Sequence, residues 1–272
     1  MAAPRAVVTG PQAAPPRVGL IVSAVTPNGE GSRWQGGITY DPETGTTGYR
    51  ADLCEPTEGA RDLDPQPDVV EWDAYAVGDG ILCTALAANR TDWRAQVRRQ
   101  LESVAERQVS AELWGGTLAQ AHGYPNLWLD NGNAESVGAP GQSPRVGLAL
   151  LEQYLADTAR GQRGMVHAPR AVVSVWAQVG GIRREGGLLL TVHDTIVVPA
   201  AGYPNDDGKV FATGMVEVRR GEVEVTGDPL SQGAHVDRST NTVEVRAEQA
   251  ALASWDGVAH GTVQVDLDVV TA

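Results

Sequence analysis

The segment 27–67 constrains this chain more than any other part of it. Gly, Asp, Pro and Thr crowd the segment, and aliphatic side chains are sparse. Trp34, Tyr40 and Tyr49 flank the turn-forming sequence 41–48, which predicts a long β-hairpin that projects from the body. A hairpin with so few aliphatic residues has little core of its own, so it must rest on another surface. In a monomer it would fold back, and in an assembly it would lie on a neighbouring chain.

The chain as a whole can bury a sizeable core. Its 272 residues, 42% of them hydrophobic, suffice for one large domain or two ordinary ones. Glycine and proline are abundant but follow no short repeat, which excludes collagen and argues against wholesale disorder. The longest uncharged apolar runs fall far short of the roughly 20 residues that span a bilayer, and the N-terminus has no apolar block of signal-peptide length. We therefore expect no membrane partner and a protein that stays in the cytoplasm where it is made.

The net charge argues against binding of nucleic acid by the surface as a whole. The formal charge is −13 at pH 7, whereas proteins that bind polyanions with their whole surface carry a clustered basic face. All basic residues except Lys209 are arginines.

The clearest helix in the sequence spans residues 91–114. Apolar residues recur near the helical period from Trp93 to Leu113, Thr91 is a suitable N-cap, and two glycines follow. The other side of this helix is charged, and it carries Arg94, Arg98, Arg99, Glu102, Glu106, Arg107 and Glu112. These charges are either solvated or in contact with a neighbouring subunit, and the residue types alone favour neither.

The remaining elements mix helices with strands. Residues 1–17 are rich in Ala and Pro and predict a mobile arm. Further helices are expected at 146–159 and 169–179, and strands at 69–77, 81–86, 165–168, 188–199, 216–225 (turning at Arg220 and Gly221), 242–255 and 261–269. The fold class is therefore α+β.

The common catalytic and binding motifs are absent from the sequence. It contains no phosphate-binding loop, no dinucleotide fingerprint, no serine-nucleophile elbow and no zinc-protease helix motif. The five histidines are widely separated, and Cys54 and Cys83 suit reduced, buried thiols better than a disulfide or a zinc site. His193 and Asp194 are adjacent, but neighbours on a strand face opposite ways. We therefore predict no catalytic residue, no cofactor and no metal.

The order of these elements resembles the major capsid protein family of tailed bacteriophages, whose fold is called HK97-like. Residues 69–86 and 89–116 look like the strand and the long spine helix of that family. The parts similar to its axial domain and to the closing strands of its peripheral domain are 164–169, 188–199, 202–203 and 241–266.

The resemblance implies a division of the chain. It predicts an N-terminal arm (1–26), an extended β-hairpin loop (27–67), a peripheral domain (68–144) with its spine helix (91–114), an axial α/β domain (145–239) and closing strands of the peripheral domain (240–272).

The resemblance also implies a structural protein and no enzyme. The chain would self-assemble, as pentamers and hexamers, into the icosahedral shell that encloses a phage genome; it would be made in the bacterial host cytoplasm and end in the virion capsid. Further partners would be double-stranded DNA, packaged without sequence-specific binding, and portal, scaffolding or decoration proteins. Too few residues precede the hairpin for a fused helical scaffolding segment, which leaves scaffolding to a separate protein or to none.

In such a shell the projecting hairpin and the charged helix face are the candidates for contact between subunits. The residues expected there are Trp34, Tyr40, Tyr49, Arg50, Arg98, Arg99 and Glu102. No lysine lies in 1–208, so the lysine–asparagine crosslink that some family members make from the extended loop cannot form in that way. Two alternatives stay open: an encapsulin-like nanocompartment, which shares the fold but encloses protein cargo, and a β-rich cytoplasmic enzyme with an unrecognised site.

Overall fold

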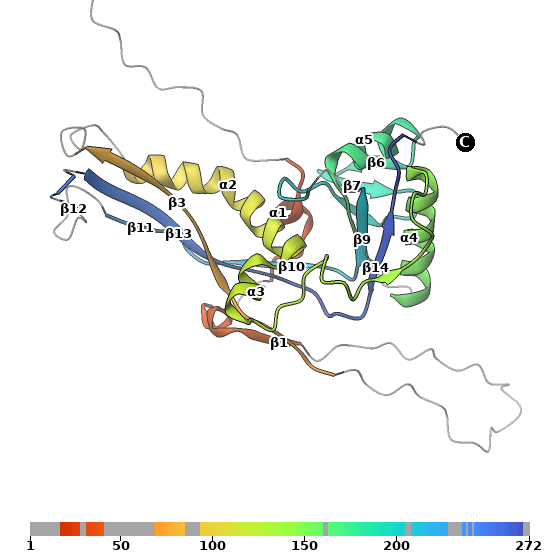
Figure 1. The fold of residues 1–272 in the computed structure, drawn as a ribbon, viewed down its shortest axis with the longest axis horizontal. Coiled ribbons are helices and arrows are strands. Elements are labelled where there is room, and N and C mark those ends of the chain that lie inside the picture. Colours follow the sequence, from red (N-terminus) through yellow and green to blue (C-terminus); the bar gives the residue numbers. More distant parts are fainter. Residues whose placement is uncertain are drawn as a thin grey trace, which may run out of the picture.

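The computed structural model describes residues 17–27, 31–40, 68–84, 93–159, 163–204, 208–227, 236–237, 239–240 and 242–268. These residues form two parts that lie side by side (Figure 1). One part is an elongated sheet with a long helix along it, and the other is a compact α/β unit.

The elongated sheet is built around its longest strand, β13 (Thr242–Ser254). β3 (Tyr75–Thr84) pairs antiparallel with one edge of β13 along the whole of β3. The other edge of β13 receives three short antiparallel strands in turn, which are β10 (Glu217–Arg220), β11 (Glu224–Thr226) and β12 (Val236–Asp237). β13 alternates from Thr242 to Ala250: residues such as Val243 and Val245 are buried, and those between them face the other way, whereas the last four residues of the strand are all buried.

The helix α2 (Trp93–Gly115) covers one face of this sheet (Figure 1). Its buried stripe includes Val97, Leu101, Ala105 and Val109, which recur at helical spacing and pack in one core with the inward residues of β13. At about 1.5 Å per residue the helix is about 34 Å long, so it supports β3 and β13 over most of their length. The predicted helix is confirmed, although its predicted N-cap lies outside the described residues.

The compact unit is a seven-stranded mixed sheet with the strand order β4-β14-β9-β5-β8-β7-β6. The strands are β4 (Glu135–Ser136), β5 (Met165–His167), β6 (Ile182–Glu185), β7 (Leu188–Thr191), β8 (Ile196–Val198), β9 (Lys209–Thr213) and β14 (His260–Gln264). Two helices, α4 (Pro144–Thr158) and α5 (Arg170–Gln178), complete the unit. Ser143 caps α4 by accepting a hydrogen bond from the Val146 N–H.

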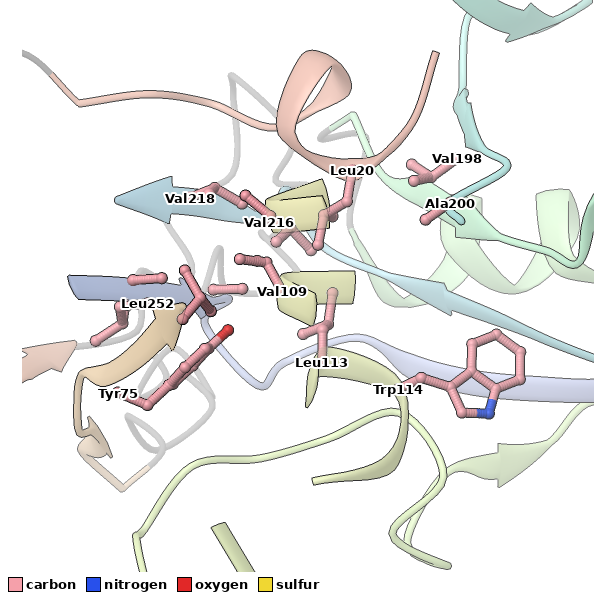
Figure 2. Packing of buried hydrophobic residues seen from close by; sticks show 14 of the residues in the cluster. Leu20, Tyr75, Val109, Leu113, Trp114, Val198, Ala200, Val216, Val218 and Leu252 are labelled. Carbon is pink, nitrogen blue, oxygen red and sulfur yellow. The ribbon is translucent and has the colours of Figure 1, made fainter. Parts of the chain in front are cut away.

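The central strands of the compact unit are buried on both faces. Val166 and Val197 face one core with α4 and α5, whereas Met165, Ile196 and Val198 belong to the core shared with α2 (Figure 2). A strand covered on both sides reads as a continuous apolar run, as β8 does, whereas β5 ends in the buried His167.

Short elements join the two parts and border the segment 41–67. α1 (Leu20–Ser23) lies against α2, and the 3-10 helix η1 (Arg33–Gly36) precedes β1 (Ile38–Tyr40). β1 pairs antiparallel with β2 (Val70–Trp72), and α3 (Thr117–His122) follows α2. The predicted hairpin segment therefore has a paired base, while its residues 41–67 lie outside those described.

Three predictions about strands differ from the structure. Residues 188–199 form two strands, β7 and β8, because a turn with Asp194 at φ 67° separates them. Residues 216–225 do not form a hairpin, since β10 and β11 each pair with β13. The last two strands also do not stay in one part: β13 lies in the elongated sheet, whereas β14 pairs with β9 and β4 in the compact unit.

None of the described helices is long and apolar enough to cross a membrane.

Truncating Leu101 to alanine tests how far the α2 stripe stabilises the subunit. Leu101 is fully buried, so the change should lower the free energy of unfolding by about 2–5 kcal/mol through lost transfer energy and a residual cavity. Urea unfolding of the unassembled subunit, followed by circular dichroism, measures this. Glu102→Ala on the exposed side is the matched control and should cost under about 1 kcal/mol. Equal losses in the two variants would contradict this packing.

Candidate functional site

Five of the seven predicted contact residues are described by the structure. Trp34 and Tyr40 lie at the base of the projecting segment, and Arg98, Arg99 and Glu102 lie on the outward side of α2. Tyr49 and Arg50 lie outside the described residues. The described candidates thus lie in two separate regions, at η1 and β1 and on α2.

The base of the projecting segment is fastened to the body by polar contacts. The Tyr40 hydroxyl donates to Glu217 Oε2 at 2.9 Å and lies 3.1 Å from Ser254 Oγ. Glu217 also pairs with Arg219, whose Nε is 2.5 Å from Glu217 Oε1. Burial, together with the nearby Glu217 carboxylate, raises the pKa of Tyr40, so its hydroxyl stays protonated and able to donate. These contacts set the point at which the chain leaves the body.

Another chain is not needed to cover Trp34, and its contact with a neighbouring subunit stays a prediction. Trp34 is 7% exposed in the single chain and belongs to the core that includes Trp72 and Tyr75. Few aliphatic residues lie near Trp34 in the segment 27–67, but the fold supplies apolar neighbours from β2 and β3. Whether Tyr40 and the α2 residues contact a neighbouring subunit stays a prediction.

Two acidic residues of α2 are not solvated, contrary to the first of the two interpretations of its charged side. Glu106 is 3% exposed, and its carboxylate accepts the backbone N–H groups of Leu20 (2.6 Å) and Ile21 (2.8 Å) at the start of α1. Burial raises the pKa of Glu106, and these two N–H donors oppose that rise. Gly19 is required here, because its φ is 152° and a Cβ would lie 2.2 Å from Glu106 Oε1.

Glu112 plays the same part at the other end of α2. Its carboxylate accepts the N–H groups of Leu118 (3.0 and 2.9 Å) and Ala119 (2.9 Å) at the start of α3. The sequence carried a signal for both residues: Glu106 precedes the buried Val109 by three positions, and Glu112 follows it by three, so both border the apolar stripe.

A buried polar group links the compact unit to α2. The His167 ring lies 2.7 Å from the Tyr203 hydroxyl through Nδ1 and 2.9 Å from Thr213 Oγ1 through Nε2. Burial lowers the pKa of His167 to about 3, so the ring is neutral at physiological pH. Tyr203 in turn packs on Trp114 of α2, with ring centroids 4.8 Å apart.

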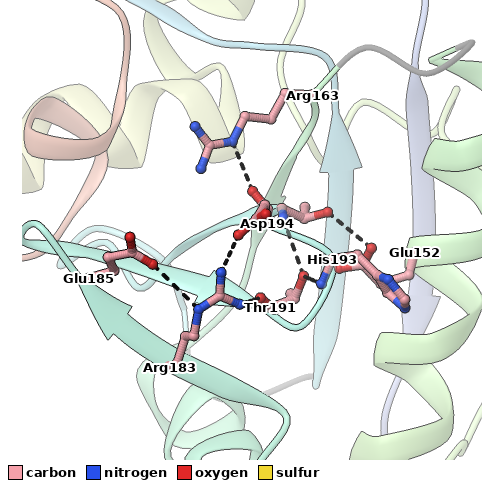
Figure 3. A network of polar contacts seen from close by, with 8 residues as sticks. Glu152, Arg163, Arg183, Glu185, Thr191, His193 and Asp194 are labelled. Carbon is pink, nitrogen blue, oxygen red and sulfur yellow. Dashed lines mark hydrogen bonds and ion pairs between the residues drawn. The ribbon is translucent and has the colours of Figure 1, made fainter.

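The surface turn between β7 and β8 holds a polar network (Figure 3). The Asp194 carboxylate pairs with Arg183, Arg163 Nε donates to the Asp194 carbonyl at 2.8 Å, and Thr195 donates to Glu152 at 3.0 Å. Among the described residues Asp194 therefore binds arginine and forms no dyad with His193. The network fastens a turn, and its groups are not arranged for nucleophilic or acid–base catalysis.

Within the part of the chain that the structure describes, no three His, Cys, Asp or Glu side chains are grouped so that they could hold a metal ion. Lys209 is the only lysine in the sequence. Its Nζ lies 2.9 Å from Asp130 Oδ1 in an ion pair at the surface.

No protein-family model and no curated protein sequence matches this chain. Solved structures do match it over nearly its full length. The capsid of a native GTA particle shares 12% identity and a TM-score of 0.60, with 97% of this chain and 95% of that chain covered. A protein of Mycobacterium phage Adephagia shares 13% identity and a TM-score of 0.56, with 96% and 95% covered.

An encapsulin also matches. The holo-SrpI encapsulin complex of Synechococcus elongatus shares 13% identity and a TM-score of 0.50, with 77% of this chain and 80% of that chain covered. At these identities the likeness establishes a common fold. It confirms the predicted α+β fold class, and these neighbours are shell structures rather than enzymes.

Replacing Glu106 with glutamine tests how α1 is held. Glutamine keeps the size but turns one acceptor oxygen into an N–H donor that faces a backbone N–H. The Leu20 and Ile21 amides should lose about 1–3 kcal/mol of protection, which hydrogen–deuterium exchange measures as about 5-fold to 150-fold faster exchange. Glu102→Gln, on the exposed side of the same helix, is the control and should leave both amides unchanged. Equal exchange in the two variants would show that Glu106 does not hold α1.

The buried His167 predicts a loss of stability in acid. A histidine with an ordinary pKa of 6.5 in the unfolded chain and about 3 in the fold stabilises fully above pH 6.5. This stabilisation is lost as the pH falls toward 3, at up to about 1.4 kcal/mol per pH unit. His167→Gln should be less stable at pH 7 and should show a flatter pH dependence between pH 6.5 and 4 in urea unfolding. His193→Gln at the surface should keep the wild-type slope, and a wild-type slope in His167→Gln would refute the assignment.

Proposed function

The chain has the HK97-like fold, and from that premise we propose that it is a major capsid protein, many copies of which assemble into the icosahedral shell around a phage genome. The observation that carries the proposal is the coverage of the likeness. The likeness covers 97% of this chain and 95% of a GTA capsid chain, so it concerns the whole subunit and not one domain of it.

The shape of the subunit supports a role in a shell. An elongated sheet with one long helix and a compact unit beside it offers several edges at which copies can meet (Figure 1). We assign the compact unit, including β4 and β14, to the axial domain around a five- or sixfold centre, and the β3–β13 sheet with α2 to the peripheral domain. Because the chain passes from β13 directly to β14, the two domains are joined by continuous backbone.

The segment that leaves the body between β1 and β2 is the proposed bridge between subunits. The described residues on either side of 41–67 are held together by the β1–β2 pairing and to the body by Tyr40. Tyr40, Tyr49 and Arg50 are its proposed contacts with the next subunit, and the N-terminal arm is proposed to reach over neighbours in the same way. Arg98, Arg99 and Glu102 remain candidate contacts on α2. Packaged DNA and portal, scaffolding or decoration proteins complete the proposed partners, and the virion is the proposed location.

An encapsulin-like compartment is the second candidate. It is favoured by the likeness to the Synechococcus encapsulin, which is weaker in TM-score and in coverage than the likeness to the GTA capsid. The two candidates predict the same kind of shell and differ in its content, which would be DNA in the first and protein in the second.

Size-exclusion chromatography with negative-stain microscopy tests the proposal. We expect the purified chain to elute as megadalton assemblies that appear as closed, regular particles. Leu101→Ala is the matched control: its destabilised subunit should yield few or no particles. Particles from the natural source should contain DNA that resists nuclease until the shell is opened, whereas a protein cargo without DNA would favour the second candidate. A wild-type chain that stays a folded monomer would overturn both.

A further inference from the structure

The two sides of the elongated sheet carry opposite charge. The side of α2 that faces away from the sheet exposes one acidic residue, Glu102, and four basic residues, which are Arg94, Arg98, Arg99 and Arg107. Glu106 and Glu112 do not offset this charge at the surface, because both are buried and bind backbone N–H groups. Asp79 of β3 pairs with the inward-facing Ala247, so it lies on the same side of the sheet as α2 and adds one carboxylate there. The four arginines still outnumber the carboxylates on this side. A basic surface thus lies on a chain whose net charge is −13.

The open side of the same sheet is acidic. Glu244, Arg246 and Glu248 alternate with the buried residues of β13 and so face away from α2. Glu224 of β11 lies directly opposite Glu248 in the register, so two like charges are neighbours there. Arg246 pairs with Glu244 at 2.6 Å, which leaves the Glu224–Glu248 pair dominating this side.

We propose that the α2 side of the sheet faces the lumen of the shell and that Arg98, Arg99 and Arg107 contact the phosphate backbone of packaged double-stranded DNA. This inference rests on the proposed function. In a shell one subunit thick, one side of the sheet faces inward and the other outward. A phosphate polyanion is attracted by the arginine side and repelled by the carboxylate side, and guanidinium groups bind phosphate without reading sequence.

The charges favour DNA over an acidic surface of a second copy. The acidic patch lies on the opposite side of the same sheet from the arginines, so copies that lie edge to edge in one layer do not bring the two together. The contact with DNA should be weak, because few arginines per subunit act against a net negative chain. A weak contact suits a shell whose inner surface touches the packaged DNA without binding it tightly.

Binding of short double-stranded DNA of mixed sequence tests the inference. Subunits released from purified shells are compared with intact shells, as wild type, as Arg98→Gln with Arg99→Gln, and as Arg145→Gln with Arg184→Gln. The last pair is the matched control, since it removes the same charge from exposed positions of the compact unit. Glutamine keeps a helix propensity close to that of arginine, so α2 should remain intact.

Released wild-type subunits should bind the DNA with an affinity that falls steeply with salt. The α2 variant should flatten the slope of log affinity against log salt by about 1.8, or about 0.9 for each lost phosphate contact, while the control variant keeps the wild-type slope. Intact empty shells should bind the added DNA much more weakly than released subunits, because the arginine side is enclosed.

The other outcomes of this experiment would contradict the proposal in different ways. Equal weakening in both variants, or wild-type binding by the α2 variant, would overturn the assignment of these arginines. Strong binding of added DNA to intact shells that depends on Arg98 and Arg99 would place the α2 side outside. If the α2 variant folds but forms no particles, these residues contact a neighbouring subunit instead. Failure of the wild-type chain to form particles would count against the proposed function itself and is seen before any DNA is added.

Discussion

The antiparallel pairing of β13 with β3 under α2 is the constraint on which the rest of the structure depends. β13 pairs with other strands along both of its edges. From Thr242 to Ala250 it buries every second residue against the apolar stripe of α2. Beyond Ser254 the same chain carries Trp255, which packs on Trp72 with ring centroids 5.0 Å apart, and then enters the compact unit as β14. One continuous run of backbone therefore lies in both sheets and ties them together.

Buried polar groups join the parts at defined points. Glu106 and Glu112 are costly to bury, and each offsets that cost by accepting backbone N–H groups that the short helices α1 and α3 would otherwise leave without partners. Gly202 approaches α2 so closely that a Cβ would lie 2.3 Å from the Arg107 carbonyl, and its N–H donates to Ser110 at 2.9 Å. Packing alone would allow these elements to slide, whereas such hydrogen bonds admit one arrangement.

This construction suits a subunit whose work is done at its surfaces. The β1–β2 pairing holds the two ends of the segment 41–67 together, and the elongated layer carries opposite charges on its two sides, which in the proposed shell would be its inner and outer surfaces. A shell protein needs both properties: directed contacts with neighbours and tolerance of its contents. Neither requires a catalytic group, and the ionisable residues buried in the described structure serve to hold elements together.

The sequence by itself determined the elements whose signal is local. The 3.6-residue period of α2 and the alternation of β13 need only their own residues, and the order of such elements was enough to predict the shell fold. Tertiary structure decided the rest. The turn at Asp194, the separate pairing of β10 and β11 with β13, and the transfer of β14 to the compact unit depend on which strand lies nearby, which no local pattern records. The burial of Trp34 and Glu106 could not be predicted for the same reason: the neighbours that bury them come from segments distant in sequence, and burial is a property of those contacts rather than of the residue type.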